Sequence, residues 1–386
     1  EKKTFHRSDE ESSEDDRETG DTVSGLQLSS VINNSQTNEY PTKAWGSSAP
    51  DSDIAPMNIV RRGLRRNDVL IEISHCGICH SDLHSARNDW GWTNYPIVPG
   101  HEIVGVVSAV GDSVTKHAVG DRVAIGCMVD SCTECKHCES NLEQYCAEGM
   151  VGTYNGTDRQ DGSRTFGGYS ERIVCREDFV LKVPDDLPMA EAAPLLCAGI
   201  TTYSPLKTWK VGPGSKVAVA GLGGLGHMGV KLAAAFGAEV TVLSRSESKR
   251  MDAKKLGAHA FLNTSENEEM KAKAGYFDLV LNTIPVRHDI TPYLHLLRID
   301  GTQVLVGVID TLPEMHSGIF LGRKILTGSG IGGLSETQEM LNFCAQHKVL
   351  PDIEIIRMKE INEAYDRMER SDVKYRFVID MTTIGS

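Results

Sequence analysis

Four cysteines in the first half of the chain are spaced closely enough to share one metal ion. Cys132, Cys135, Cys138 and Cys146 follow the pattern C-x2-C-x2-C-x7-C. Four thiolates at such spacing can surround Zn²⁺ tetrahedrally and leave no open position, as in structural sites. An iron–sulfur cluster uses a similar run, but the Cys-Pro ending of the bacterial type is missing here. The spacing therefore predicts a closed structural zinc site.

A second set of metal-binding residue types is dispersed. Cys79 precedes His80-Ser81-Asp82, the pair His101-Glu102 follows Pro-Gly, and Cys197 lies far downstream. Spacing alone does not join these residues, and a lone cysteine before a helix is most often a small core residue. The residues by themselves leave a catalytic metal site and a packing role equally open.

A glycine-rich segment in the second half fits G-x-G-x-x-G and has the context that this motif requires. A strand is predicted at residues 216–220 before it, a helix at 228–236 and a second strand at 240–243 after it. Backbone N–H groups in such a turn approach a pyrophosphate, and the helix N-terminus favours its negative charge. The alternative is a flexible loop joining strand and helix. The residues concerned are Gly221, Leu222, Gly223, Gly224, Leu225 and Gly226.

The end of that second predicted strand indicates which dinucleotide is bound. NAD enzymes usually carry Asp or Glu here, whereas this chain has Ser244 and Arg245, with Lys249 nearby. Hydroxyl and cationic groups suit the 2′-phosphate of NADP, which a carboxylate would repel. The alternative is a solvated polar loop, since charged surface loops are common.

The elements that must position these residues change character along the chain. Residues 69–74, 103–110 and 122–125 read as short strands punctuated by Gly and Pro, typical of an antiparallel β domain. Further on, strands at 277–282 and 302–308 continue an alternation of strands with helical segments. That alternation predicts a parallel, doubly wound sheet.

Composition limits the number of domains and the classes of partner that this chain can have. The chain has 386 residues, enough for about two domains, with 40% apolar and 24% charged residues. It has no apolar run long enough to cross a membrane. A net charge of −13 without a basic stripe argues against nucleic acid as a main partner. Its ten cysteines are clustered, which suggests metal before disulfides and hence a reducing, cytoplasmic compartment.

The first 40 residues differ from the rest. Residues 9–21 contain no apolar side chain, so the segment cannot bury enough surface to offset its ordering entropy. We predict a disordered acidic tail at residues 1–40. It lacks the apolar region of a secretory signal and is too acidic for an ordinary transit peptide.

From about Tyr40 onward the sequence resembles the zinc-containing medium-chain dehydrogenase/reductase superfamily. Within that superfamily it is most similar to the cinnamyl alcohol dehydrogenase branch, especially bacterial NADP-dependent aldehyde reductases. Besides the four-cysteine run, the segments that carry the resemblance are residues 77–84, 98–102, 193–201, 221–227 and 373–378.

The resemblance implies an α/β fold in which a GroES-like β domain is joined to a Rossmann doubly wound parallel-sheet domain. It places a catalytic zinc on Cys79, His101 and Cys197, with Glu102 able to approach the metal, and so two zinc ions per chain. It also implies a homodimer. The domain bounds become 41–197 for the catalytic domain with its zinc lobe, 198–335 for the cofactor domain, and 336–386 for the part that completes the catalytic domain.

Roles for further residues follow from the same resemblance. Asp82 is similar to the carboxylate that orients His101, while Ser81 and His84 resemble a relay carrying the alcohol proton to water. Their alternatives are a helix cap and a surface imidazole. Trp90 and Trp92 resemble residues beside the substrate cleft, unless they merely pack their loop. Expected cofactor contacts besides the glycine turn, Ser244, Arg245 and Lys249 are His80, Thr201, Thr283, Val306, Val308 and Ile331.

Together these features predict a zinc-dependent, NADP(H)-preferring alcohol dehydrogenase or aldehyde reductase acting on primary aromatic or medium-chain aliphatic alcohols and aldehydes. Such a metal polarises the reacting oxygen as a Lewis acid, and the hydride chemistry belongs to the cofactor. The competing interpretations are a zinc-free quinone or enone reductase on the same scaffold, and a non-catalytic binding protein that keeps the fold.

Overall fold

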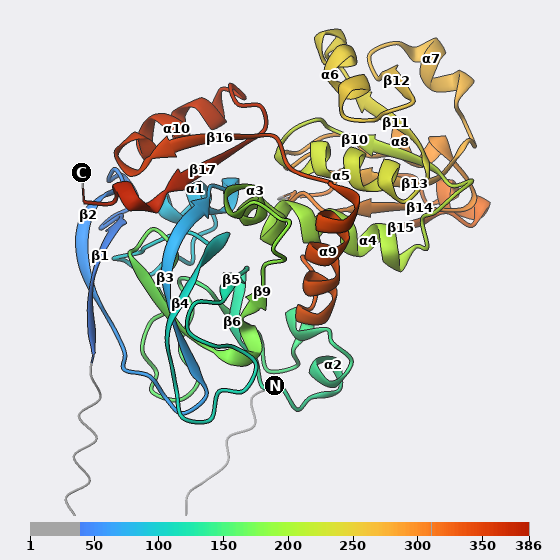
Figure 1. The fold of residues 1–386 in the computed structure, drawn as a ribbon. Helices are drawn as coiled ribbons and strands as arrows, with labels where there is room; N and C mark the ends of the chain where they lie inside the picture. Colours follow the sequence, from blue (N-terminus) through green and yellow to red (C-terminus); the bar gives the residue numbers. More distant parts are fainter. Residues whose placement is uncertain (1–38, 310, 386) are drawn as a thin grey trace, which may run out of the picture. The chain divides into compact units, whose positions relative to one another are not determined.

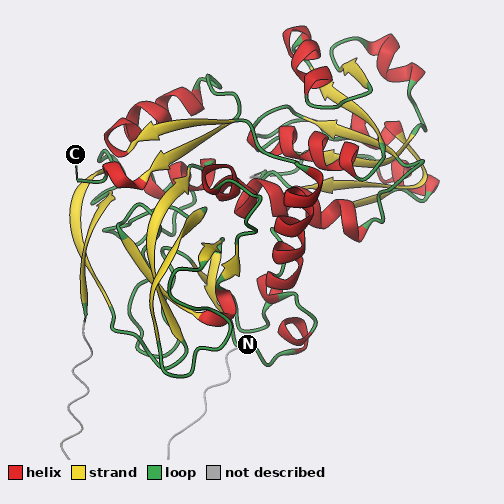
Figure 2. Cartoon of the chain, in the orientation of Figure 1, coloured by secondary structure: helices red, strands yellow, loops and turns green. Residues whose placement is uncertain are grey.

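The computed structural model describes residues 39–309 and 311–385. The described residues form two main sheets, and helices lie around these sheets (Figures 1 and 2). The predicted acidic tail lies outside the described residues apart from its last two, and Tyr40 already begins the first strand. No helix in the described part of the chain is long and apolar enough to cross a membrane.

A six-stranded, all-parallel sheet forms the second half of the chain. Its strand order, β12-β11-β10-β13-β14-β15, is the 3-2-1-4-5-6 order of Rossmann dinucleotide-binding sheets. The doubly wound prediction is therefore confirmed. The strands are β10 (Lys216–Ala220), β11 (Glu239–Ser244), β12 (Ala260–Asn263), β13 (Phe277–Asn282), β14 (Leu297–Leu305) and β15 (Ile325–Gly328).

The central strand β10 shows why this sheet is buried on both faces. Val217 and Val219 pack into one apolar cluster, while Ala218 and Ala220 pack into another on the opposite face. Side chains alternate between the faces of a strand, so a continuous apolar run suits a sheet covered on both sides. The helices of this region are α4 (Ile200–Thr208), α5 (Gly224–Ala235), α6 (Arg250–Lys255), α7 (Asn267–Ala272), α8 (Thr291–Leu296) and α9 (Leu334–His347).

Two elements in this half differ most from their predicted bounds. Helix α5 begins at Gly224 rather than at residue 228, because the last glycines of the turn are already helical. Strand β14 covers Leu297–Leu305 rather than 302–308, since it pairs with β13 and β15 further upstream. The strands predicted at 216–220 and 277–282 are confirmed with those bounds.

The other main sheet is built from both ends of the described chain. Its order is β16-β17-β3-β4-β5-β9, with β8 paired to β3. Strand β17 pairs antiparallel with β3 and parallel with β16, so the C-terminal strands complete a sheet begun near the N-terminus. The strands are β3 (Asp68–Gly77), β4 (Ile103–Val110), β5 (Arg122–Ile125), β8 (Arg172–Arg176), β9 (Leu181–Lys182), β16 (Ile353–Arg357) and β17 (Arg376–Asp380).

Smaller elements surround this sheet and carry several of the predicted site residues. Two short antiparallel pairs are formed by β1 (Tyr40–Gly46) with β2 (Ala55–Arg61) and by β6 (Met128–Asp130) with β7 (Val151–Gly152). The helices are α1 (His80–Ala86), α2 (Lys136–Glu139), α3 (Met189–Pro194) and α10 (Ile361–Glu369), and one π-helical turn covers Leu195–Gly199.

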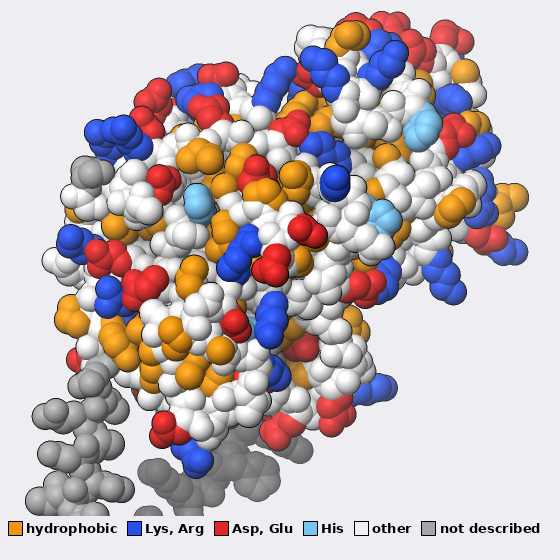
Figure 3. Space-filling model, in the orientation of Figure 1, with side chains coloured by type: hydrophobic (Ala, Val, Ile, Leu, Met, Phe, Trp, Pro, Cys, Tyr) orange, Lys and Arg blue, Asp and Glu red, His pale blue; other side chains and the backbone are white. Residues whose placement is uncertain are grey.

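The ten cysteines, all within the described residues, are free of disulfides. On the face drawn in Figure 3, acidic and basic side chains of the described residues lie interspersed, so the electrostatic field over that face is mixed in sign.

Candidate active site

The four dispersed ligand candidates converge in a buried cluster. One ligand atom each from Cys79, His101, Glu102 and Cys197 lies within 4.8 Å of all the others, and the four residues are buried. The Sγ atoms of Cys79 and Cys197 are 3.8 Å apart. Two thiolates and an imidazole form the donor set of catalytic zinc sites that keep a position open.

Strand pairing brings the N-terminal ligands together. Cys79 precedes α1 at the end of β3, and His101 lies just before β4; these strands run antiparallel with Cys76 opposite Ile103. Cys197 comes from the π-helical turn that separates α3 from α4. Such turns recur at functional sites because they displace a side chain from the regular helical position.

Asp82 ties the ligand segments to one another. Its carboxylate accepts the N–H groups of Cys79 at 2.9 Å and Gly100 at 3.0 Å. The same carboxylate lies 3.0 Å from Nδ1 of His101, and Asp82 is fully buried. A hydrogen bond at Nδ1 leaves Nε2 as the metal-binding atom of the imidazole.

The charge and hydrogen bonding of these ligands suit a cation bound among them. The hydrogen bond from the Cys197 thiol lowers the pKa of Cys79 well below its ordinary value, although burial opposes this. Zinc binds thiolates, so a metal ion would replace the proton that the two sulfurs share. Oε2 of Glu102 is buried without a hydrogen-bond partner among the described residues, a state that a nearby cation would relieve. The residues present therefore fit a zinc ion.

The four-cysteine run forms the second cluster. One ligand atom each from Cys132, Cys135, Cys138 and Cys146 lies within 4.8 Å of the others. Backbone N–H groups, first that of Ala147, lower the pKa of Cys135 to about 6, which favours its thiolate form at neutral pH. Burial raises the pKa of Cys138 to about 12. A cation is needed to hold all four as thiolates, and this set fits a closed metal site.

The glycine turn has the backbone geometry of a phosphate site. Gly221 has φ +90°, and a side chain at Gly226 would meet the Gly221 carbonyl oxygen at 2.2 Å, so both positions require glycine. A side chain at Gly223 would meet nothing within 4 Å, and helix α5 starts at the next residue. The open space at the N-terminus of α5 fits a pyrophosphate.

The loop after β11 carries the predicted phosphate-binding side chains. Ser244 is the last residue of β11, and Arg245 is exposed beyond it. Nζ of Lys249 donates to the Leu222 carbonyl oxygen at 3.2 Å, which brings the ammonium group to the glycine turn. Burial lowers the pKa of Lys249, and an anion bound here would favour its charged form.

The predicted relay residue His84 belongs to an aromatic row. Its Nδ1 atom lies 2.7 Å from the Asp89 carboxylate, a partner that sequence reasoning missed. The ring centroids of His84 and Trp90 are 5.5 Å apart, as are those of Trp90 and Trp92. Trp92 is 64% exposed, which is more than a tryptophan that only packs its loop would be. Ser81 is half-buried in the first turn of α1, whose N-cap is Cys79.

The other expected cofactor residues occupy varied positions. Thr283 is buried and donates to the Ala220 carbonyl oxygen at 2.9 Å, beside the glycine turn. Ile331 has φ +40°, a strained value for a β-branched residue and one that clusters at ligand sites. The others are His80, exposed at the start of α1; Thr201, buried in α4; and Val306 and Val308, half-buried and exposed after β14.

Arg376 is the main functional candidate that sequence reasoning missed. Its guanidinium pairs with the Glu102 carboxylate, and both side chains are buried. A side chain at Gly224 would meet Nη1 of Arg376 at 3.0 Å, so the guanidinium lies beside the glycine turn. The one signal was its place in residues 373–378, a segment that carries the family resemblance without a stated role.

Comparisons with known proteins identify both halves of the chain. Residues 65–185 match the family model of the alcohol dehydrogenase GroES-like domain, and residues 224–346 match that of the zinc-binding dehydrogenase.

The chain matches its relatives over nearly their whole length. The chain is 53% identical to a probable formaldehyde dehydrogenase of Bacillus subtilis (strain 168), over 90% of this chain and 99% of that protein. It is 54% identical to an NADP-dependent alcohol dehydrogenase of Mycolicibacterium smegmatis (strain ATCC 700084 / mc(2)155), over 89% and 99%. A cinnamyl alcohol dehydrogenase structure from Sorghum bicolor superposes with a TM-score of 0.87 at 44% identity, covering 90% and 99%. The chain belongs to the zinc-binding dehydrogenase family and is an oxidoreductase with its GroES-like and Rossmann-type domains.

Proposed function

We propose that this chain is a zinc-dependent, NADP(H)-preferring alcohol dehydrogenase that interconverts primary alcohols and aldehydes. The observation that carries the proposal is the convergence of Cys79, His101 and Cys197 in one buried cluster. When bound there, zinc supplies a Lewis acid for the reacting oxygen, and the nicotinamide supplies or takes the hydride.

The chain's own residues would hold and orient these groups. Asp82 fixes the imidazole of His101, and Ser81 with His84 would move the alcohol proton toward solvent. Asp89 would hold His84 in the tautomer whose Nε2 is free to accept that proton, since it lies 2.7 Å from Nδ1. We place the second zinc of each chain in the four-cysteine lobe.

The preference for NADP(H) is supported by the loop after β11. At the end of β11, where NAD enzymes usually carry an acidic residue, this chain has Ser244 and exposed Arg245, and partly buried Lys249 adds a second cation. The cofactor would also contact the glycine turn, Thr283 and Ile331. The relative from Mycolicibacterium smegmatis is named as NADP-dependent, which agrees with this assignment.

The substrate class is best tested by comparing small and large aldehydes, because the relatives are named for substrates as different as formaldehyde and cinnamyl alcohol. The aromatic row that ends at Trp90 and Trp92 favours apolar or aromatic aldehydes. With NADPH, kcat/KM should be higher for benzaldehyde, cinnamaldehyde and hexanal than for formaldehyde, acetaldehyde or acetone. Trp92→Ala should narrow the preference for cinnamaldehyde over acetaldehyde. Formaldehyde or acetone as the best substrate would overturn the aromatic assignment.

We also propose a cytoplasmic homodimer with domains at about 41–197, 198–335 and 336–386. Ten free cysteines favour a reducing compartment. Strand β15 is the last strand of its sheet, and Phe320, Leu321 and Ile325 beside or within it are exposed apolar residues. A second copy that covers this edge would bury them. Light scattering should give twice the chain mass, and Ile325→Asp should lower it toward a monomer.

A further inference from the structure

One face of helix α5 contacts the segment that leads to the C-terminal strands. His227 and Lys231 are four residues apart on α5, so they lie on the same helical face. The His227 ring stacks on Tyr375, with centroids 4.9 Å apart and planes inclined by 13°. Nδ1 of His227 is 2.8 Å from the Gly224 carbonyl oxygen, which fixes the ring against the first turn of the helix.

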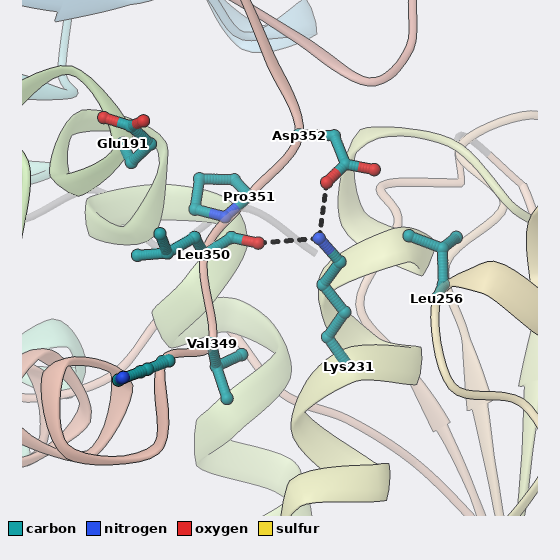
Figure 4. A pocket seen from close by; sticks show the side chains of 8 residues that line it. Glu191, Lys231, Leu256, Val349, Leu350, Pro351 and Asp352 are labelled. Atoms are coloured by element: carbon teal, nitrogen blue, oxygen red, sulfur yellow. Dashed lines mark hydrogen bonds and ion pairs between the residues drawn. The ribbon is translucent and has the colours of Figure 1, made fainter.

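Lys231 makes the second contact of this face (Figure 4). Its ammonium group donates to the Leu350 carbonyl oxygen at 2.7 Å and to the Asp352 carboxylate at 2.5 Å. These residues lie between α9 and β16, where Lys231 enters a pocket of about 450 Å³ lined partly by Leu350 and Asp352. The side chain of Lys231 is 19% exposed and that of Asp352 is 50% exposed, so the lysine is the more shielded partner of this pair.

The backbone joins the two contacts. The Asp352 carbonyl oxygen accepts the N–H groups of Tyr375 at 2.9 Å and of Arg376 at 3.2 Å. Lys231 therefore holds Asp352, Asp352 holds the backbone of Tyr375 and Arg376, and His227 holds the ring of Tyr375. Together they define the position from which the Arg376 side chain departs.

Arg376 extends from that position to both halves of the active site. Its guanidinium pairs with buried Glu102 of the metal cluster, and it lies against Gly224 of the glycine turn. The first turn of α5 would bind the cofactor. The following turn carries Lys231, which holds Arg376 in place through Asp352. Misplacing such a group by about 1 Å can reduce catalysis by about a hundredfold.

We propose that His227 and Lys231 are positioning residues that set Arg376 between the cofactor turn and Glu102, and thereby couple cofactor affinity to the metal site. This inference rests on the proposed function, because it assumes that the glycine turn binds NADP(H). The positioning residues act through Arg376 and need not touch the substrate.

The first test measures NADPH binding to the zinc-loaded full chain by nucleotide fluorescence. Lys231→Met keeps the aliphatic stem on α5 but removes the bonds to Leu350 and Asp352, and should raise the NADPH dissociation constant about tenfold. The matched control is Lys207→Met, which removes a lysine–carboxylate bridge from α4 to Glu339 on α9. That control should leave the dissociation constant unchanged. Zinc content and Tm are measured for every variant, and for the two lysine variants both should stay near the wild-type values.

A double-mutant cycle separates positioning from general destabilisation. Arg376→Gln alone should weaken NADPH binding, and Lys231→Met should add no further loss in that background, because its effect passes through the guanidinium. His227→Leu, which removes the stacked ring, should behave in the same way. Additive losses, or wild-type affinity in Lys231→Met, would overturn the proposal.

The outcomes also distinguish this inference from the proposed function. A wild-type enzyme that binds NADPH and reduces aldehydes, beside a Lys231→Met variant of equal affinity, refutes only the positioning role. A wild-type chain that binds no NADPH refutes both.

Discussion

At the scale of single residues, one carboxylate connects the segments that carry the candidate metal ligands. Asp82 bonds the backbone of Cys79, the backbone of Gly100 and the ring of His101. Three bonds to one buried group fix two ligand segments relative to each other. Such pre-organisation lowers the ordering entropy that metal binding must offset.

Replacing one cysteine of each cluster should separate the two metals. Cys197→Ser should remove about one of two zinc ions per chain and abolish turnover, with little change in Tm, because the surrounding core remains packed. Cys135→Ser should lower Tm and release the other ion, since a closed site contributes folding energy. Elemental analysis, NADPH oxidation and calorimetry check these results. Iron in the purified chain, or a single zinc per chain, would contradict the assignment.

Charge reversal in the loop after β11 should change cofactor preference. Arg245→Asp places a carboxylate where the 2′-phosphate would lie, so kcat/KM with NADPH should fall at least about tenfold while that with NADH changes less. Arg250→Asp, a nearby exposed arginine paired with Glu247, serves as the control and should leave the ratio nearly unchanged. A wild-type enzyme that uses both nucleotides equally would show that this loop does not discriminate.

At the scale of elements, helix α5 carries a histidine whose charge state is set by burial. Burial lowers the pKa of His227 from 6.5 to about 4. Between these values the unfolded chain binds the proton and the folded chain does not, so the free energy of unfolding decreases as the pH falls from 6.5 toward 4. The interval of about 2.5 pH units corresponds to ~3 kcal/mol from this one group.

His227→Phe keeps a flat ring on Tyr375 and removes the titration. Its free energy of unfolding should therefore depend less on pH between 4 and 6.5 than that of the wild type, as measured by denaturant titration. His347→Gln, which removes an exposed imidazole from α9, is the comparison variant. Equal pH dependence in wild type and His227→Phe would mean that folding does not lower the pKa of this imidazole.

The elements also show what sequence reasoning could reach. The strands at 103–110, 122–125, 216–220 and 277–282 were predictable because their apolar runs are bounded by turn residues. The start of α5 was not, because glycines that form a turn can also be helical. Residues close together in the sequence were the easiest to assign. The four-cysteine site was predictable from spacing, whereas only the family resemblance placed Cys79, His101 and Cys197 in one site.

Contacts made only by folding remained out of reach. Arg376 and Glu102 are 274 positions apart, and no spacing rule connects them. The pairing of strand β17 with β3 brings this arginine to the metal cluster. The Asp89 contact with His84 is local, but its five-residue separation is not a helical repeat and gave no signal.

At the scale of the whole molecule, this chain is longer than the part of it that its relatives match. The relative from Bacillus subtilis is matched over 99% of its length by 90% of this chain. Deleting residues 1–36 should leave kcat/KM and Tm nearly unchanged, because the composition of that segment offers little apolar surface to bury. Assays and thermal melts of the shortened chain test this. A loss of several degrees or several-fold in rate would assign the segment a role in the folded enzyme.

The four-cysteine lobe also contacts the start of helix α9. The Glu143 carboxylate accepts the N–H of Leu334 at 3.0 Å, and the Tyr145 hydroxyl accepts the N–H of Gly330 at 3.1 Å. Both side chains come from the 3₁₀ turn that immediately precedes Cys146. If this lobe holds the zinc that we propose, removing the ion would loosen that turn and free these amides. In hydrogen–deuterium exchange, the lobe and the first turn of α9 should therefore lose protection together when a chelator is added, although almost two hundred residues separate them.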